Sequence, residues 1–183
     1  LRDLIPYQIE NVRIRYLSDQ ISNGYAYGAD LKVNGEFVSG TQSWASISLM
    51  NTREDIVGDG HGYIPRPSDQ RFKFSFFFQD YLPGIPEFQM NLSGHYITGA
   101  PFGMPRTERW QQVARMDAYK RIDVGLTRSL VVNGQNLTKF KFLDELKSCN
   151  VGVEVFNMLD FDNTSSYFFV ADFDNVYRAV PNR

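Results

Sequence analysis

The stretch RFKFSFFFQD, residues 71–80, alternates between two kinds of side chain. Phe72, Phe74, Phe76 and Phe78 fall on every second position, and most residues between them are polar. Successive side chains of a strand point to opposite faces, so this alternation predicts an extended strand with two unlike faces. Similar patterns recur along the chain with little helical competition. We expect strands at residues 11–17, 25–34, 44–52, 71–80, 88–98, 121–132 and 151–159.

Turn residues separate several of these segments. Asn-Gly tolerates positive φ and is the strongest short signal for a hairpin, so neighbouring strands should be antiparallel. The turn pairs are Asn23-Gly24, Asn34-Gly35, Pro83-Gly84 and Asn133-Gly134. Residues 137–147 carry the one helical pattern, which we interpret as a short surface helix inside a turn.

The connections between the expected strands differ in length. In an antiparallel meander, alternate connections lie at the same edge of the sheet. One edge then carries residues 35–43, 82–87 and 133–148, and the other carries 18–24, 53–70 and 99–120. The two longest loops share an edge, which is typical of an outer-membrane barrel. The fit is imperfect, because 18–24 is short for the long side and 133–148 is long for the short side.

Two architectures fit this pattern about equally well. A soluble sandwich turns the apolar faces of two sheets toward one shared core. An outer-membrane barrel turns one face toward lipid and the other toward a wet lumen. Aromatic residues near the expected strand ends suit the membrane interfaces of a barrel, although a sandwich with scattered aromatics would look similar. These residues are Tyr25, Tyr27, Trp44, Tyr81, Phe88 and Tyr119.

Composition narrows the function classes. A net charge of −2 over 183 residues indicates no general attraction to nucleic acid or acidic lipid. The chain has no apolar run of about 18 residues that would form a transmembrane helix. Its one cysteine, Cys149, excludes an internal disulfide. The first residues, LRDLIPYQIENV, do not resemble a signal peptide, so an exported protein would not begin here.

Three parts of the chain resemble the C-terminal part of the barrel of TonB-dependent outer-membrane receptors, in the form common in Bacteroidetes. They are residues 24–50 with 60–86, residues 99–126, and residues 151–183. The most specific matches are EVFNMLD at Glu154–Asp160, NTSSY at Asn163–Tyr167 and AVPN at Ala179–Asn182. In the family these motifs lead into the last barrel strand. They are structural signatures and say nothing about cargo.

This resemblance implies an all-β fold, in which residues 1–183 form an antiparallel up-and-down meander within a large transmembrane barrel of about 22 strands. It also implies an N-terminal plug, uptake energised by the inner-membrane TonB complex, and lipid and lipopolysaccharide around the barrel, with a surface lipoprotein as a candidate partner. The plug and the final strand, which ends in an aromatic residue, are not in the sequence. We therefore expect a C-terminal segment of the receptor, located in the bacterial outer membrane.

The loop at residues 105–121 carries the candidate binding residues. Arginine forks bind carboxylates and phosphates, so this loop could form a mouth for an anionic or aromatic ligand. The residues chosen are Arg106, Arg109, Trp110 and Arg115. The preferred alternative is that these cations pair with lipopolysaccharide phosphates, or with Glu108 and Asp117.

No catalytic or metal motif stands out. His61 and His95 have no partner at a metal-ligand spacing, and Asp160 with Asp162 lacks the rest of a calcium loop. No G-x-S-x-G context is present. We expect no enzyme activity and no cofactor. The expected function is nutrient uptake of a metal chelate, glycan or peptide, and the alternative is a soluble β-rich binding module of a secreted or periplasmic protein.

Two further expectations concern the faces and edges of the sheet. The apolar, lipid-facing positions should be Val12, Ile14, Leu31, Ile47, Leu49, Phe72, Phe74, Phe76, Leu92, Ile122, Val124, Val153 and Val155. The inward positions should be Arg13, Lys32, Ser48, Lys73, Asn91, Asp123 and Glu154. The sheet should stay open, with one edge at residues 12–17 and the other at residues 167–170, each lacking a partner in this chain.

Overall fold

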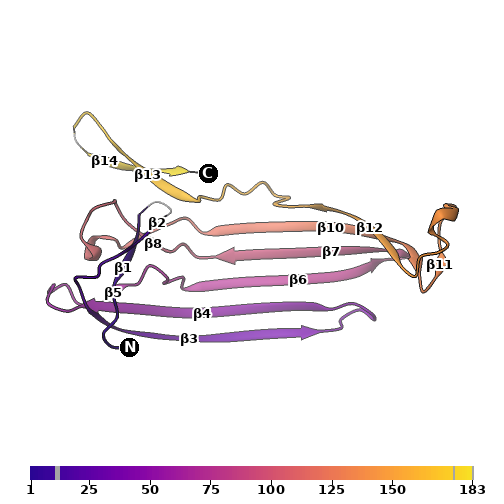
Figure 1. Ribbon diagram of the computed structural model, residues 1–183, viewed down its shortest axis with the longest axis horizontal. Helices are drawn as coiled ribbons and strands as arrows, with labels where there is room; N and C mark the ends of the chain where they lie inside the picture. Colours follow the sequence, from indigo (N-terminus) through magenta and orange to yellow (C-terminus); the bar gives the residue numbers. More distant parts are fainter. Residues whose placement is uncertain (11–12, 175, 183) are drawn as a thin grey trace.

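Figure 1 shows the computed structural model of the protein, which describes residues 1–10, 13–174 and 176–182. The fold is all-β and its sheets are antiparallel, as the alternation predicted. The large, eight-stranded sheet contains β3 (Ser22–Gly35), β4 (Ser43–Ile56), β5 (Ile64–Pro65), β6 (Phe72–Leu82), β7 (Ile85–Ile97), β10 (Tyr119–Val132), β11 (Gln135–Asn136) and β12 (Cys149–Val155). Among the described residues, no sheet closes on itself.

The long strands of this sheet form an up-and-down meander. β3, β4, β6, β7, β10 and β12 lie side by side in chain order, each antiparallel to the next. The short β5 pairs with one end of β4, and the short β11 pairs with one end of β10. The predicted meander is therefore confirmed.

The two ends of the sheet differ, as the connection lengths predicted. Residues 57–71 and 98–118 connect strands at one end, here called the loop end, where the N-terminal segment also lies (Figure 1). Residues 36–42, 83–84 and 133–148 connect strands at the opposite end, here called the turn end.

The turn signals are confirmed at two of the four positions and wrong at the other two. Asn133 and Gly134 have φ values of 50° and 79° and join β10 to β11 in a two-residue hairpin. Gly84, with φ of 78°, joins β6 to β7. Asn23-Gly24 and Asn34-Gly35 instead lie inside β3, because β4 is long enough to pair with both.

The helix expected at residues 137–147 is not present. That segment contains only a single 3₁₀ turn, η2 (Lys141–Leu143). Local side-chain hydrogen bonds hold this segment in place of helical ones. The side-chain amide of Asn136 donates to the Phe140 carbonyl and to Asp144. Among the described residues, no helix is both long and apolar enough to span a membrane.

The cross-strand register gathers the apolar positions on one face of the large sheet, here called the apolar face. One row across neighbouring strands consists of Phe78, Leu92, Val124 and Val155. Two further rows cross β3, β4 and β6. One consists of Ala29, Leu49 and Phe72, and the other of Leu31, Ile47 and Phe74. The predicted division of the faces is therefore confirmed within the sheet. Val12 lies outside the described residues.

Polar side chains on the opposite face hydrogen-bond to one another, both within a strand and across neighbouring strands. His95 Nδ1 lies 3.1 Å from the Ser75 hydroxyl. Arg121 Nε donates to Asp123 at 2.7 Å, and Asp123 also accepts from the Ser93 hydroxyl at 3.4 Å. This face, here called the polar face, therefore carries hydrogen-bonded groups of polar side chains.

The large sheet is not covered by a second sheet. Apart from prolines, the buried apolar residues among those described are only Ile56, Ile64, Val131 and Leu143. The shared dry core of the sandwich alternative is therefore not present. The sheet is a single layer whose apolar face is open over most of its area (Figure 1).

Smaller hairpins lie at the loop end, and they show that the predicted edges of the large sheet were wrong. They are β1 (Tyr7–Glu10) with β2 (Arg13–Tyr16), β8 (Pro101–Phe102) with β9 (Ala114–Arg115), and β13 (Ser166–Ala171) with β14 (Tyr177–Asn182). The strand expected at 11–17 is not the first strand of the meander, because β2 pairs with β1; Ile14 and Arg13 thus lie outside the large sheet. The strand near residues 167–170 also has its partner, β14, within this chain. The open edges of the large sheet are instead β3 and β12.

Candidate functional site

The loop end is held together by two carboxylates that belong to the large sheet and its first long loop. Glu54, near the end of β4, is fully buried. Its Oε1 lies 2.9 Å from a guanidinium nitrogen of Arg109, which belongs to the 3₁₀ turn η1 (Arg109–Gln111). Its Oε2 lies 3.3 Å from Nε of Arg66 and accepts from the Ser22 hydroxyl at 3.4 Å. Glu54 therefore joins three separate segments of the chain.

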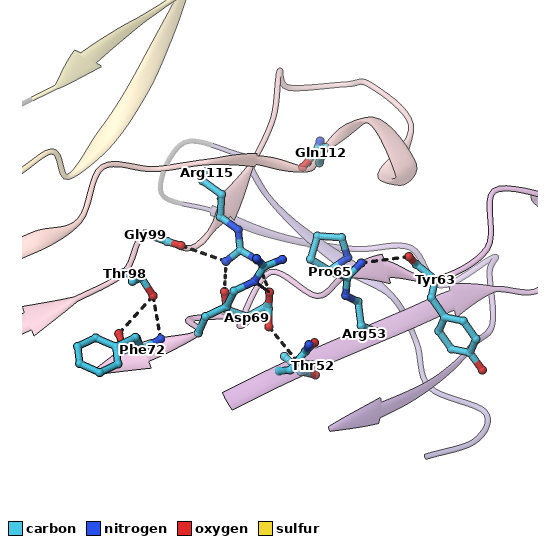
Figure 2. A network of polar contacts seen from close by, with 12 residues as sticks. Thr52, Arg53, Tyr63, Pro65, Asp69, Phe72, Thr98, Gly99, Gln112 and Arg115 are labelled. Carbon is cyan, nitrogen blue, oxygen red and sulfur yellow. Dashed lines mark hydrogen bonds and ion pairs between the residues drawn. The ribbon is translucent and has the colours of Figure 1, made fainter. Parts of the chain in front are cut away.

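Asp69 is the second of these buried carboxylates. It forms an ion pair with Arg115 of β9, which also donates to the Asp69 and Gly99 carbonyls (Figure 2). The other carboxylate oxygen of Asp69 accepts from the Thr52 backbone N–H at 2.8 Å. Arg71 lies on the outer side of this cluster, with Nε 3.6 Å from Asp69. Asp69 thus ties residues 98–118 to β4.

Burial makes both pairs structural. Desolvation lowers the pKa of Arg109, while the adjacent Glu54 carboxylate opposes that shift. A buried charge that loses its partner destabilises a protein by about 3–5 kcal/mol. Arg109 also donates to the Gln112 carbonyl and the Pro65 carbonyl, so its guanidinium is occupied on several sides.

The predicted ion-pair partners of this loop are wrong. The sequence indicated Glu108 and Asp117 as partners because they are close along the chain. Arg109 and Arg115 instead reach Glu54 and Asp69. The sequence held one sign of the true partners. Glu54 continues the polar positions of residues 44–52 by the same alternation, which places it on the polar face. Nothing in the sequence pattern indicated Asp69 as a partner.

The other two candidate residues lie at the surface. The Trp110 ring stacks on His61, with centroids 4.1 Å apart and planes at 17°. Arg106 is exposed and has a positive φ of 63°. Its backbone N–H donates to Glu10 of β1 at 3.1 Å, which attaches this loop to the N-terminal hairpin.

Tyr167 attaches the β13–β14 hairpin to the same loop. Its ring stacks on Phe102 with centroids 4.4 Å apart, and its hydroxyl donates to Asp117 at 2.9 Å. Burial, together with the bond to Asp117, raises the pKa of Tyr167. A small hollow beside this stack is lined by Ile9, Phe102, Met116 and Phe169, among others.

Comparisons with known proteins found no match to this chain, whether among family models, curated proteins or solved structures. Among the residues that the structure describes, no group of three or more His, Cys, Asp or Glu side chains is placed to hold a metal ion. Any functional assignment therefore depends on the geometry and on the sequence motifs.

Proposed function

We propose that this chain forms part of the transmembrane barrel of a TonB-dependent outer-membrane receptor. The receptor takes up a large or scarce nutrient, such as a metal chelate, a glycan or a peptide, with energy from the inner-membrane TonB complex. The plug and other strands of the same receptor are its partners, together with outer-membrane lipid and lipopolysaccharide, and a surface lipoprotein is a further candidate. The motifs at Glu154–Asp160, Asn163–Tyr167 and Ala179–Asn182 favour this family over other barrels.

The open apolar face is the observation that carries the proposal. Leu31 is 62% exposed, Leu49 52% and Val153 71%, although all three lie within strands of the large sheet. A soluble monomer rarely leaves so large an apolar surface in water, because its exposure promotes association. Lipid acyl chains would cover this face without any further protein layer.

Strand length supports the same environment. β3, β4 and β10 each have 14 residues, whereas about 9–11 tilted residues suffice to cross a bilayer. At about 3.4 Å per residue and a tilt of about 45°, 14 residues rise about 34 Å along the membrane normal, which exceeds the hydrocarbon core of about 30 Å. Strands of soluble proteins are usually about 5–6 residues long.

The polar face suits a hydrated lumen. Arg121, Asp123, Ser93 and His95 are hydrogen-bonded on that face, where lipid would leave their remaining donors and acceptors unpaired. The open edges at β3 and β12 have unpaired backbone groups, which hydrocarbon does not tolerate. In this proposal, other strands of the same receptor pair with both edges.

The loop end would face the cell exterior, since long loops of outer-membrane barrels lie outside. Of the four candidate ligand residues, Arg106 and Trp110 are the exposed ones. We assign ligand contact to these two, and a supporting role in holding the loop to Arg109 and Arg115.

Membrane fractionation and cysteine labelling test this proposal. We expect the protein in the outer-membrane fraction, extractable only with detergent. In a Cys149→Ser background, a water-soluble maleimide should label Ser48→Cys on the polar face and leave Leu49→Cys unlabelled in intact membranes. A soluble binding module would label at both positions, because Leu49 is exposed, and would remain in solution without detergent.

A further inference from the structure

Arg71 differs from the other arginines that contact a carboxylate at the loop end. Its side chain is 56% exposed, compared with 29% for Arg115 and 1% for Arg109. Its Nε lies 3.6 Å from Asp69, beyond hydrogen-bond distance, and its guanidinium makes no hydrogen bond to any other described residue. An arginine side chain has five N–H donors, so Arg71 offers a full set to a ligand.

Arg71 and Arg115 line the same surface hollow. Its remaining lining residues are Thr98, Gly99, Met116 and Ala118. Arg115 uses Nη1 for two carbonyls and Nη2 for Asp69, which leaves its Nε–H and one Nη2–H without an acceptor among the described residues. Both arginines therefore border one space, and each has N–H donors without an acceptor among the described residues.

The charge of this hollow is positive. Two guanidinium groups share the single carboxylate of Asp69, which leaves a net charge of +1. The carboxylate of Asp117, the residue after Met116, accepts from the Tyr167 and Thr164 hydroxyls and so has its own partners. The Thr98 hydroxyl is likewise occupied, by the backbone N–H and carbonyl of Phe72.

The hollow borders the apolar face of the large sheet. Arg71 lies in the connection just before β6, at the loop end of the large sheet. Arg71 also lines a second, mostly apolar hollow together with Tyr27, Ala29 and Leu49, which belong to the apolar face by their register. A molecule that lies along the apolar face could therefore place a charged group against Arg71.

We propose that Arg71 and Arg115 form a binding site for the phosphate group of a membrane lipid. Guanidinium groups bind phosphate oxygens through paired, charge-assisted hydrogen bonds, and a phosphate monoester has enough oxygens for two arginines. The proposal rests on the membrane location given above, since a lipid-covered apolar face brings headgroups to the level of Arg71. Anionic headgroups also attract basic residues at a membrane surface.

Lipid binding to the purified protein in neutral detergent micelles tests the site. The probes are phosphatidic acid, diacylglycerol with the same acyl chains, and inorganic phosphate, and native mass spectrometry measures the bound fraction. We expect phosphatidic acid to bind and diacylglycerol not to bind. Arg71→Gln should weaken phosphatidic acid binding about tenfold, which corresponds to the loss of one hydrogen bond to a charged group. Arg71→Lys keeps the charge but lacks the forked guanidinium, so its affinity for phosphatidic acid should lie between that of the wild type and that of Arg71→Gln.

Arg128→Gln is the matched control. Arg128 lies on the same face at the turn end, is 42% exposed and carries the same charge, and we expect its loss to leave binding unchanged. Equal binding of phosphatidic acid and diacylglycerol, or no effect of Arg71→Gln, would overturn the site. Inorganic phosphate that binds as tightly as phosphatidic acid, and depends on Arg71, would overturn the assignment to a lipid. These results differ from failure of the proposed function, in which the protein would not enter the outer membrane.

Discussion

Arg109 and Glu54, 55 residues apart in the chain, form a 2.9 Å ion pair in which both side chains are closed off from solvent. The pair connects the end of β4 to the turn η1 and so fixes residues 98–118 at the loop end of the large sheet. Arg109 was a candidate ligand residue on sequence grounds, and the structure shows it to be an internal connection.

Arg109→Met should release the 98–118 loop. Glu54 would keep Arg66 as a partner but lose its closest cation, so we expect a local destabilisation toward the lower end of about 3–5 kcal/mol. Limited proteolysis and hydrogen exchange of residues 98–118 measure this change. Arg106→Met is the control, because Arg106 is exposed and such surface changes usually stay within about 0.5 kcal/mol. Equal protection of the loop in both variants would contradict the role given to Arg109.

Phe74→Lys and Ser75→Lys introduce the same side chain at neighbouring positions on opposite faces. In the proposed barrel, lysine on a lipid-facing position near the membrane midplane would cost about 2–4 kcal/mol, whereas the lumen would accept it. Phe74→Lys should therefore block assembly into the outer membrane, while Ser75→Lys, despite losing its contact with His95, should assemble. Lys73→Ser should also be mild. Heat-modifiable migration of the membrane fraction on gels measures assembly, and failure of both lysine variants alike would argue against a lipid face.

Gly99→Ala should distort the loop end. A Cβ at Gly99 would lie 1.8 Å from the backbone carbonyl oxygen of Met116, which cannot move aside as a flexible side chain can. We expect destabilisation of about 1–3 kcal/mol, as for overpacked sites. Gly35→Ala is the matched control, because a Cβ there meets no atom within 4 Å. Thermal unfolding of the two variants should separate them; a Gly99→Ala protein as stable as Gly35→Ala would show that the close approach to Met116 is not maintained.

Acid should weaken the contact between β1 and the loop around Arg106. Burial raises the pKa of Glu10, but bonds from the Arg106 backbone N–H and from the Gln8 and Arg15 side chains outweigh it, so the pKa is lowered in the folded protein. A carboxyl group with a lowered pKa stabilises the fold at pH values above the pKa that it has in the unfolded chain, about 4.3. This stabilisation is lost as the pH falls through the pKa of the folded state. The protection of the Arg106 amide against hydrogen exchange, measured relative to an unprotected amide at the same pH, should therefore fall below about pH 4 in the wild type. Glu10→Gln should remove this pH dependence, and a wild-type profile that stays flat in acid would contradict the assignment.

The sequence by itself determined the strands and their faces. The period-two alternation at Phe72, Phe74 and Phe76 follows from backbone geometry, so it indicates which side chains share a face before any partner is known. The same holds for Asn133-Gly134, whose φ values suit a two-residue hairpin. Loop lengths then separated the loop end from the turn end, because consecutive strands of a meander reverse direction.

Only the tertiary structure decided which segments pair and which charges meet. Asn23-Gly24 had the local chemistry of a turn, yet β4 pairs with it and extends β3 through it. Residues 137–147 had a helical apolar stripe, but with most of that stripe exposed, little packing is available to offset the cost of starting a helix. Arg109 and Arg115 had acidic residues close by in sequence and instead bind Glu54 and Asp69, because long side chains pair with whatever carboxylate the fold brings to them in a buried place. Local geometry is set by neighbouring residues, whereas burial and long-range pairing depend on the whole chain.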